Sequence, residues 1–333
     1  MRNSPEFDLI GAIRDRLGAR DRDDVRIGIG DDAAVVDEGG GARAVTVDAI
    51  VDGVAFRRSW CPPRSIGRKA AGAALSDLAA MGAAPSELYV WVGLPEDFGR
   101  EQALELCDGL ADLAELSGAV LLGGDLTASP VLAVAVTAIG RTADPRRMIG
   151  RSGAAPGEAI CVTGALGGAA AGLMLLEHPE LVDEVPPDAA AAATERQLSP
   201  TPRLAAGRAL AAAGATAMID VSDGLGADAE HLAAASGVGI EIEVATVPVA
   251  AGVAEAAAAG GRDATEFVIA GGEDYELLCS VPRAALAECR AAVAAAGTEL
   301  AEIGRADPGS SVRLRLPGGR SVPASGHDHL AGS

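Results

Sequence analysis

Two adjacent aspartates follow a glycine turn near the N-terminus, in the stretch Gly28-Ile29-Gly30-Asp31-Asp32-Ala33-Ala34. Glycine reaches backbone angles closed to other residues, so the chain can bend sharply there and approach a ligand closely. A surface turn rich in Asp and Gly is the alternative interpretation of this stretch taken alone. Four later stretches also place an acid at the edge of an apolar segment: Thr46-Val47-Asp48, Ser76-Asp77, Gly123-Gly124-Asp125 and Asp220-Val221-Ser222-Asp223-Gly224. We interpret all five as parts of one divalent-metal and phosphate site.

Local periodicity brings some of these acids together. Residues 44–50 alternate, which predicts a strand with Thr46 and Asp48 side by side on one face. A solvent-facing strand edge would show the same alternation. A proline pair begins a predicted helix that ends at Met81, and the small apolar face of this helix carries Asp77. An acid on such a face is costly unless something pairs with it, so the helix favours a functional carboxylate.

Further acids follow strands. Residues 217–221 predict a strand that delivers Asp220 and the polar residues just after it. Residues 119–122 predict a short buried strand that ends before Asp125. A glycine turn at 164–168 lies between a predicted strand and helix, where it could cradle an anion or allow close packing. The P-loop pattern G-x-x-x-x-G-K-[ST] occurs nowhere in the chain.

The chain has 333 residues and is 49% hydrophobic, which is enough for two domains of ordinary size. Strands and helices interleave along it, which predicts an α/β fold with mixed sheets. The segment 142–156 combines Asp-Pro, Arg-Arg and a Pro-Gly turn, as interdomain connections often do. We therefore expect one domain over residues 1–145 and a second over residues 146–333.

The formal net charge is -20, which argues against nucleic acid or an anionic membrane as a partner, because both attract basic surfaces. Five cysteines with no CxxC pair indicate buried free thiols in a reducing compartment. The four histidines do not cluster with cysteines, so a zinc site is not expected. The N-terminal residues form no apolar leader, and we expect a cytoplasmic protein.

The chemistry of the acidic motifs indicates magnesium. Two carboxylates about 4 Å apart repel by roughly 4 kcal/mol at an effective dielectric constant near 20, so several stay ionised together only with cations between them. Carboxylate and hydroxyl oxygens are hard ligands, which favours magnesium over zinc and leaves manganese or calcium open. Basic residues such as Lys69 and Arg151 would suit the phosphates of a metal-bound nucleotide. The residues alone thus indicate a magnesium-dependent phosphate-transfer enzyme without a P-loop, its acceptor undefined.

Six motifs in one order resemble thiamine-monophosphate kinases, which belong to the aminoimidazole-ribonucleotide synthetase-like superfamily. They are Gly-Ile-Gly-Asp-Asp-Ala-Ala (28–34), Ser-Asp-Leu-Ala-Ala-Met-Gly-Ala (76–83), Leu-Leu-Gly-Gly-Asp (121–125), Arg-Ser-Gly-Ala-Ala-Pro-Gly (151–157), Ile-Asp-Val-Ser-Asp-Gly-Leu (219–225) and Gly-Gly-Glu-Asp-Tyr-Glu-Leu (271–277). The likeness covers residues 6–330. It implies two α/β domains and a homodimer whose N-terminal sheets form a barrel at the interface.

The resemblance also implies a reaction and a set of site residues. The γ-phosphate of ATP would pass directly to thiamine monophosphate, the last step in making thiamine diphosphate. The implied magnesium ligands are Asp32, Thr46, Val47, Asp48, Asp77, Asp125, Asp220 and Asp223, with Asp223 acting in catalysis through the metal. The implied ATP contacts are Gly124, Asp125, Arg151 and Ser222, and the implied thiamine contacts are Ala55, Glu273 and His327.

Three positions depart from the family pattern. Ala55 stands where the family commonly has a histidine that touches substrate, and His327 stands in place of an aromatic residue that stacks on thiamine. Val47 replaces a hydroxyl residue and could bind metal only through its carbonyl group. These departures leave three alternatives open: a related kinase with another acceptor, a magnesium-dependent phosphohydrolase, and a nucleotide-binding protein without catalysis.

Overall fold

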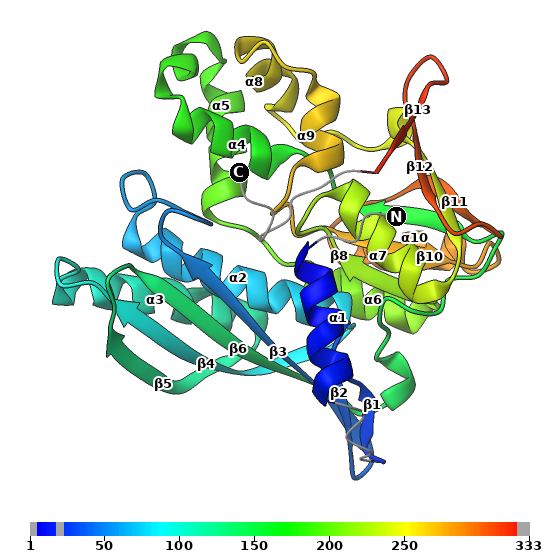
Figure 1. The fold of residues 1–333 in the computed structure, drawn as a ribbon, viewed down its shortest axis with the longest axis horizontal. Helices are drawn as coiled ribbons and strands as arrows, with labels where there is room; N and C mark the ends of the chain where they lie inside the picture. The colour runs from blue at the N-terminus through cyan, green and yellow to red at the C-terminus, as the bar shows by residue number, and fades with distance from the viewer. Residues whose placement is uncertain (1–4, 18–22, 325–333) are drawn as a thin grey trace.

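The structure is a computed structural model that describes residues 5–17 and 23–324. Two sheets lie on either side of a central layer of helices, and a group of helices covers one end of the molecule (Figure 1). Within the described residues, no helix combines the length and apolar character that a bilayer crossing needs.

The N-terminal sheet has the strand order β1-β2-β3-β6-β4-β5. Its pairs are antiparallel except for β4 with β5, which is parallel and follows the crossover through α3. The strands are β1 (Val25–Ile27), β2 (Ala34–Glu38), β3 (Gly41–Val51), β4 (Ala84–Leu94), β5 (Val120–Ala128) and β6 (Ala133–Thr142). The strand predicted at 44–50 is confirmed, and every second residue from Ala42 to Thr46 is buried.

The C-terminal sheet has the strand order β13-β12-β9-β11-β7-β10-β8. Its pairs are antiparallel except for β12 with β9. The strands are β7 (Ala159–Thr163), β8 (Ala217–Asp220), β9 (Gly239–Glu243), β10 (Leu277–Val281), β11 (Leu300–Asp307), β12 (Val312–Arg315) and β13 (Ser321–Pro323). β8 is the last strand in this order, and its C-terminal residue is Asp220.

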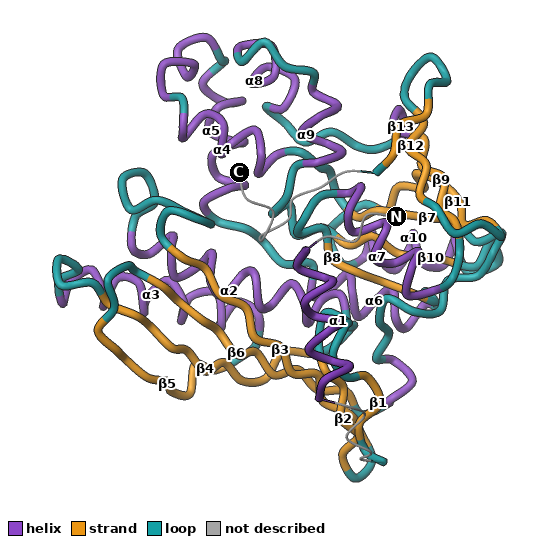
Figure 2. Tube along the Cα trace, in the orientation of Figure 1, coloured by secondary structure: helices purple, strands orange, loops and turns teal. Residues whose placement is uncertain are grey.

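Helices cover both sheets and close one end of the molecule (Figure 2). They are α1 (Pro5–Leu17), α2 (Pro63–Ala80), α3 (Arg100–Ser117), α4 (Gly168–Glu177), α5 (Pro187–Leu198), α6 (Leu204–Ala213), α7 (Leu225–Ser236), α8 (Val253–Ala259), α9 (Ala264–Ala270) and α10 (Leu286–Ala295). Three short 3₁₀ helices are η1 (Pro145–Arg147), η2 (Pro179–Glu184) and η3 (Val244–Thr246). The helices α4, α5, α8 and α9 pack on one another around their own small core.

The helix α2 is the element that joins the two sheets. It packs on α3 and on β3 and β6 of the N-terminal sheet, and also on α6 and β8 of the second half. Close backbone approach is required here, because a Cβ on Gly67 or Gly109 would lie within about 2 Å of a carbonyl oxygen of the facing helix: 2.0 Å from Leu106 O and 1.9 Å from Arg64 O. Buried side chains of both sheets form one continuous core around α2, which fixes the residues of this helix relative to both halves.

Two sequence-based expectations are wrong. The strand expected at 119–122 as short and buried runs from Val120 to Ala128 and is mostly exposed. Gly123, Gly124 and Asp125 therefore lie inside a strand that pairs with β4, and not in a turn. Cys107 is exposed, whereas the other four cysteines are buried, all five being free thiols.

Candidate active site

Three carboxylates from distant parts of the chain converge at the junction of the two halves. Asp32 follows the glycine turn before β2, Asp77 lies on α2 and Asp220 ends β8. One oxygen from each lies within 4.8 Å of the others. The structure thus brings together three of the acids that the sequence singled out, and α2 supplies Asp77.

Hydroxyl groups orient two of these acids. Thr46 Oγ1 donates to Asp77 Oδ2 at 2.5 Å, which links β3 to α2. Ser76 Oγ donates to Asp220 Oδ2 at 2.6 Å, which links α2 to β8. Ser76 and Asp77, which are adjacent on α2, therefore connect this helix to β8 and to β3 respectively. Asp32 Oδ2 is buried and has no hydrogen-bond partner among the described residues, which leaves an oxygen available to a ligand.

The three acids oppose one another's ionisation. Burial raises the pKa of Asp32 to about 6 and that of Asp220 to about 8, with like charges adding to the shift and Arg151 opposing it. Burial, together with the charges of Asp220 and Asp48, places the pKa of Asp77 well above its usual range. A bound cation would reverse this balance, since it favours the ionised form of every acid around it. The donor set fits magnesium: it consists of hard oxygens, and one of them is buried without a partner.

Arg151 lies against the same acids. Its Nε and Nη2 atoms donate to Asp32 Oδ1 at 3.0 and 2.5 Å. Its backbone N–H donates to both carboxylate oxygens of Asp31, so the two adjacent aspartates bind the side chain and the backbone of one residue. The guanidinium group is thereby fixed next to the three clustered carboxylates, where it could donate to a phosphate oxygen.

Asp228 is a buried residue of this region that the sequence reasoning missed. It lies in the first turn of α7, and its Oδ2 atom accepts hydrogen bonds from the backbone N–H groups of Ser222 and Asp223, both at 3.2 Å. Burial, with the nearby acids, holds its pKa well above the usual range. The available signal was an acid in the first turn of a helix just after the Asp220 motif. Asp228 shapes the turn that presents Ser222 and Asp223.

A cavity of about 720 Å³ opens over the carboxylate cluster. It reaches from the glycine turn to the loop before β10. Predicted site residues that line it are Asp32, Thr46, Val47, Asp48, Ala55, Asp77, Arg151, Asp220, Ser222, Asp223 and Glu273. Ala55 and Glu273, the predicted acceptor contacts, thus share one cavity with the acids. His327 lies outside the described residues.

Gly124 and Asp125 lie elsewhere in the same chain. β5 is three strands from β3 in the sheet, which places Asp125 about 14 Å from the β3 residues at the usual strand spacing. Asp125 is opposite Trp91 in the strand register, and both are exposed on the face that points away from α2. Within one chain, Asp125 therefore does not join Asp48 or Asp77.

Lys69 does not line the cavity, although the sequence suggested it as a partner of nucleotide phosphates. Its ammonium group is fully buried and lies 2.9 Å from Glu273 Oε1. The glycine turn at 164–168 is also already occupied: Gly167 and Ala169 donate their N–H groups to the Asp274 carboxylate, which caps α4. The turn therefore serves helix capping and close packing.

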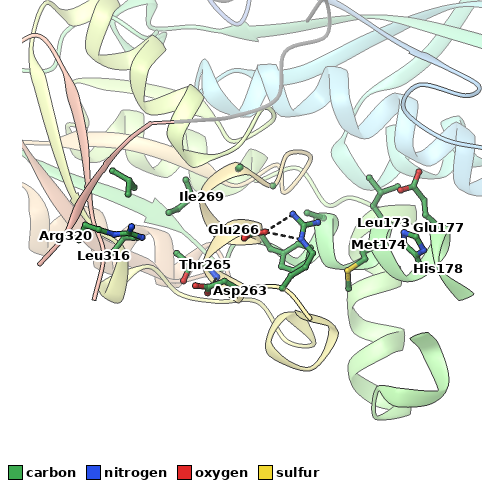
Figure 3. Close-up of a pocket in the computed structure, with 16 residues that line it drawn as sticks. Leu173, Met174, Glu177, His178, Asp263, Thr265, Glu266, Ile269, Leu316 and Arg320 are labelled. Atoms are coloured by element: carbon green, nitrogen blue, oxygen red, sulfur yellow. Dashed lines mark hydrogen bonds and ion pairs between the residues drawn. The ribbon is translucent and has the colours of Figure 1, made fainter. Parts of the chain in front are cut away.

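A second cavity of about 720 Å³ adjoins the first (Figure 3). The two share Ala170, Leu173, Ala270 and Gly271 as lining residues. Figure 3 shows Leu173 and Met174 of α4 facing this cavity from one side and Leu316 and Arg320 of the β12–β13 region from the other. Among its described lining residues are none of the predicted site residues, and one of its cations, Arg262, is paired with Glu266 at 2.9 Å.

Two family models together match most of the chain. Residues 30–142 match the N-terminal domain of AIR synthase related proteins, and residues 155–317 match their C-terminal domain. The chain is 40% identical over 280 residues to the thiamine-monophosphate kinase of Mycobacterium tuberculosis strain H37Rv, which covers 83% of this chain and 82% of that protein. It is 32% identical over 325 residues to the thiamine-monophosphate kinase of Aquifex aeolicus strain VF5, covering 98% of each.

Solved structures give the same answer. The complex described as "AaThiL complexed with AMPPCP and TMP" superposes with a TM-score of 0.86 at 32% identity, covering 98% of this chain and 97% of that chain. The HypE-HypF complex matches at 19% identity with a TM-score of 0.75 over 97% of this chain and 100% of that chain, which shows the fold alone. The chain belongs to the thiamine-monophosphate kinase family, within the AIR synthase related proteins.

Proposed function

We propose that this protein transfers the γ-phosphate of ATP to the phosphate of thiamine monophosphate, giving thiamine diphosphate and ADP. The observation that carries the proposal is the cluster of Asp32, Asp77 and Asp220 under a cavity that also contains Arg151 and Glu273. Relatives of 32–40% identity over most of the chain bear the name of this activity, and a structure that matches over 98% of the chain contains AMPPCP and TMP.

Magnesium would be held by Asp32, Asp77 and Asp220, with Thr46, Asp48 and Asp223 completing the set in the same cavity. When bound, it would neutralise the charge of the phosphates and stabilise the charge that develops during transfer. Val47 and Ser222 line the same cavity. We propose the carbonyl of Val47 as a contact of the metal and the side chain of Ser222 as a contact of ATP.

The chain itself contributes positioning and charge. Arg151 is held by the two aspartates of the glycine turn, so its guanidinium group is already oriented for a phosphate oxygen. The acceptor is itself a phosphate and thus an anionic nucleophile, so no side chain has to remove a proton. An acceptor oxygen attacks the γ-phosphorus, the bond to the bridging oxygen breaks, and ADP leaves. Glu273, which lines the same cavity, would orient the thiamine moiety.

The proposal includes a homodimer formed through the N-terminal sheets. The sheet face away from α2 exposes apolar residues, with Val47 at 66% and Trp91 at 38% of full exposure. Gly124 and Asp125 lie too far from the carboxylate cluster of their own chain to contact it. A second copy packed on this face could bring them close to the cluster of the other chain. A barrel built from both sheets is the arrangement that we propose. A Trp91→Asp variant should lower the molar mass measured by light scattering and reduce activity, and an unchanged mass would contradict it.

We also propose that the boundary between the two domains lies between residues 145 and 146. The connection between β6, which ends at Thr142, and β7, which begins at Ala159, contains this point. The two family models end at residue 142 and begin at residue 155, on either side of it.

The test is ADP release from ATP and magnesium with and without thiamine monophosphate, with thiamine diphosphate followed by the fluorescence of its oxidised form. The proposal predicts ADP formation that depends on the acceptor and matches thiamine diphosphate formation one to one. ADP formed equally without acceptor would indicate a phosphohydrolase. Retained ATP binding without turnover would indicate a binding protein, and both results would overturn the proposal.

A further inference from the structure

Lys69 carries a fully buried ammonium group at the junction of the two halves. It lies on α2, and its relative exposure is 0%. A buried cation is costly unless it is paired and hydrogen-bonded. Lys69 Nζ meets both conditions: it lies 2.9 Å from Glu273 Oε1 and donates to the backbone oxygen of Gln197 at 3.1 Å. A helix of the N-terminal half thus inserts a charge against a loop of the C-terminal half.

Glu273 has a partner at each carboxylate oxygen. Oε1 faces Lys69, and Oε2 accepts a hydrogen bond from Gln197 Nε2 at 2.8 Å. The Glu273 side chain is still 25% exposed, and it lines the cavity over the carboxylate cluster. A carboxylate has about four lone-pair positions, so two partners fix its plane and leave acceptor capacity toward the cavity.

The backbone at Glu273 is also constrained. Its φ angle is 64°, in the left-handed region that few residues other than glycine adopt. Its N–H group donates to Ser222 O at 2.8 Å, and the N–H group of Tyr275 donates to Val221 O at 2.9 Å. The loop that presents Glu273 is therefore attached to the turn that presents Ser222 and Asp223. The position of the Glu273 carboxylate is linked to the metal-binding turn through the backbone and to α2 through Lys69.

We propose that Lys69, assisted by Gln197, is a positioning residue for acceptor recognition: it holds the Glu273 carboxylate in the single orientation that receives the acceptor. This inference rests on the proposed function, in which Glu273 contacts the thiamine moiety. Lys69 itself is fully buried and does not line the cavity, so we place it outside contact with either substrate. Because Lys69 compensates the charge of Glu273, the pair offers the acceptor an oriented hydrogen-bond acceptor more than a free negative charge.

The experiment compares steady-state kinetics of the wild-type protein and Lys69→Met, varying thiamine monophosphate and ATP separately. Met keeps the length of the side chain and removes the ammonium group. We expect the KM for thiamine monophosphate to rise about tenfold, the scale of one lost charged hydrogen bond. We expect kcat and the KM for ATP to change less than about twofold, because the group acts on acceptor binding. Unchanged acceptor KM, or equal losses in kcat, would overturn the proposal.

Two controls separate positioning from general stability. Arg68 is the neighbour of Lys69 on α2 and also reaches across to the second half, donating to Ser199 Oγ at 3.0 Å. Arg68→Met removes a contact across the same junction without touching Glu273, so the acceptor KM should stay within about twofold of wild type. Lys69→Arg keeps the charge and should recover part of the acceptor affinity that Lys69→Met loses.

A double variant tests the route through Glu273. In a Glu273→Gln background the carboxylate is gone, so adding Lys69→Met should raise the acceptor KM by less than about twofold further. Multiplying effects would mean that Lys69 acts independently of Glu273, which contradicts the proposal. The double variant leaves no unpaired carboxylate beside position 69, so it can be measured even if Lys69→Met alone does not fold. In that case Gln197→Met, expected to raise the acceptor KM about threefold, supplies the single-variant measurement.

The two proposals fail in different ways. If the wild-type protein does not convert thiamine monophosphate, the proposed function is wrong, and so is the proposed contact between Glu273 and the thiamine moiety. If wild-type turnover is normal and Lys69→Met keeps the wild-type acceptor KM, only the positioning role is wrong.

Discussion

Replacing Asp220 by Asn should stabilise the metal-free protein and abolish its response to magnesium. Asp220 is buried beside Asp32 and Asp77, and its pKa is raised to about 8 by burial first and by like charge second. Asn has the same shape and keeps an oxygen that can accept the hydrogen bond from Ser76 Oγ. The substitution therefore removes the unfavourable charge while keeping the packing and the orienting contact.

The magnitude follows from the pKa shift. A carboxyl with a pKa of about 8 in the folded chain and 3.8 ordinarily weakens folding by up to about 5 kcal/mol near pH 7.5, at about 1.4 kcal/mol per pKa unit. Asp32 and Asp77 share this repulsion and relax when Asp220 is neutral, so one substitution recovers only part of it. We expect the free energy of unfolding to rise by about 2 kcal/mol, which raises Tm by about 3 °C in a chain of this size.

Differential scanning calorimetry in EDTA and in millimolar magnesium measures this directly. The wild-type protein should gain stability from magnesium, whereas Asp220→Asn should gain little, because binding to the folded state alone stabilises it. Asp183→Asn, which changes an exposed acid of η2, is the matched control and should shift neither melting curve. A lower Tm for Asp220→Asn than for wild type in EDTA would show that the charge of Asp220 does not destabilise the metal-free protein.

Four further outcomes are expected. Asp223→Asn should lower kcat at least about 10²-fold, because it removes electrostatic stabilisation of the transferring group; near-normal turnover would remove Asp223 from the site. Ala55→His should change the KM for thiamine monophosphate more than kcat, whereas a pure kcat effect would contradict a ground-state binding role. Asp228→Leu removes the acceptor for two backbone N–H groups and should slow turnover about tenfold, while Asp228→Asn should stay within about threefold; equal losses would contradict a positioning role. Because the raised pKa values of Asp32 and Asp220 mean that the folded state binds more protons than the unfolded state, metal-free stability should fall as the pH rises from about 4 to about 8. Melting in EDTA across this range would show it, and stability that rises with pH would contradict it.

Local patterns were enough to predict the elements that carry most of the cluster. The alternation around Thr46 and the proline-initiated helix that carries Asp77 correspond to β3 and α2. These elements are long and strongly periodic, so local sequence determines their type. The convergence of Asp32, Asp77 and Asp220 could be predicted only as a hypothesis, because a pattern of acids along the chain contains no distances.

Tertiary pairing overrode local signals at three places. Gly123 and Gly124 indicated the end of a strand, yet hydrogen bonding to β4 carries β5 through them to Ala128. Lys69 was assigned to phosphate from its charge alone, whereas the fold buries it against Glu273. Asp228 gave only a helix-terminus signal, and its contacts with the turn that presents Ser222 and Asp223 depend on how α7 follows that turn. In each case the residue that determines the local structure is remote in sequence, or its position depends on a loop conformation that residue propensities do not describe.

Tracing the γ-phosphate of ATP distinguishes direct phosphate transfer between the two substrates from hydrolysis of ATP. ATP labelled at the γ-phosphorus is incubated with magnesium, thiamine monophosphate and the wild-type protein, with Asp220→Asn as the inactive control. Direct transfer predicts label in the terminal phosphate of thiamine diphosphate, in amounts equal to the ADP formed. Label recovered as inorganic phosphate, with none in thiamine diphosphate, would contradict it.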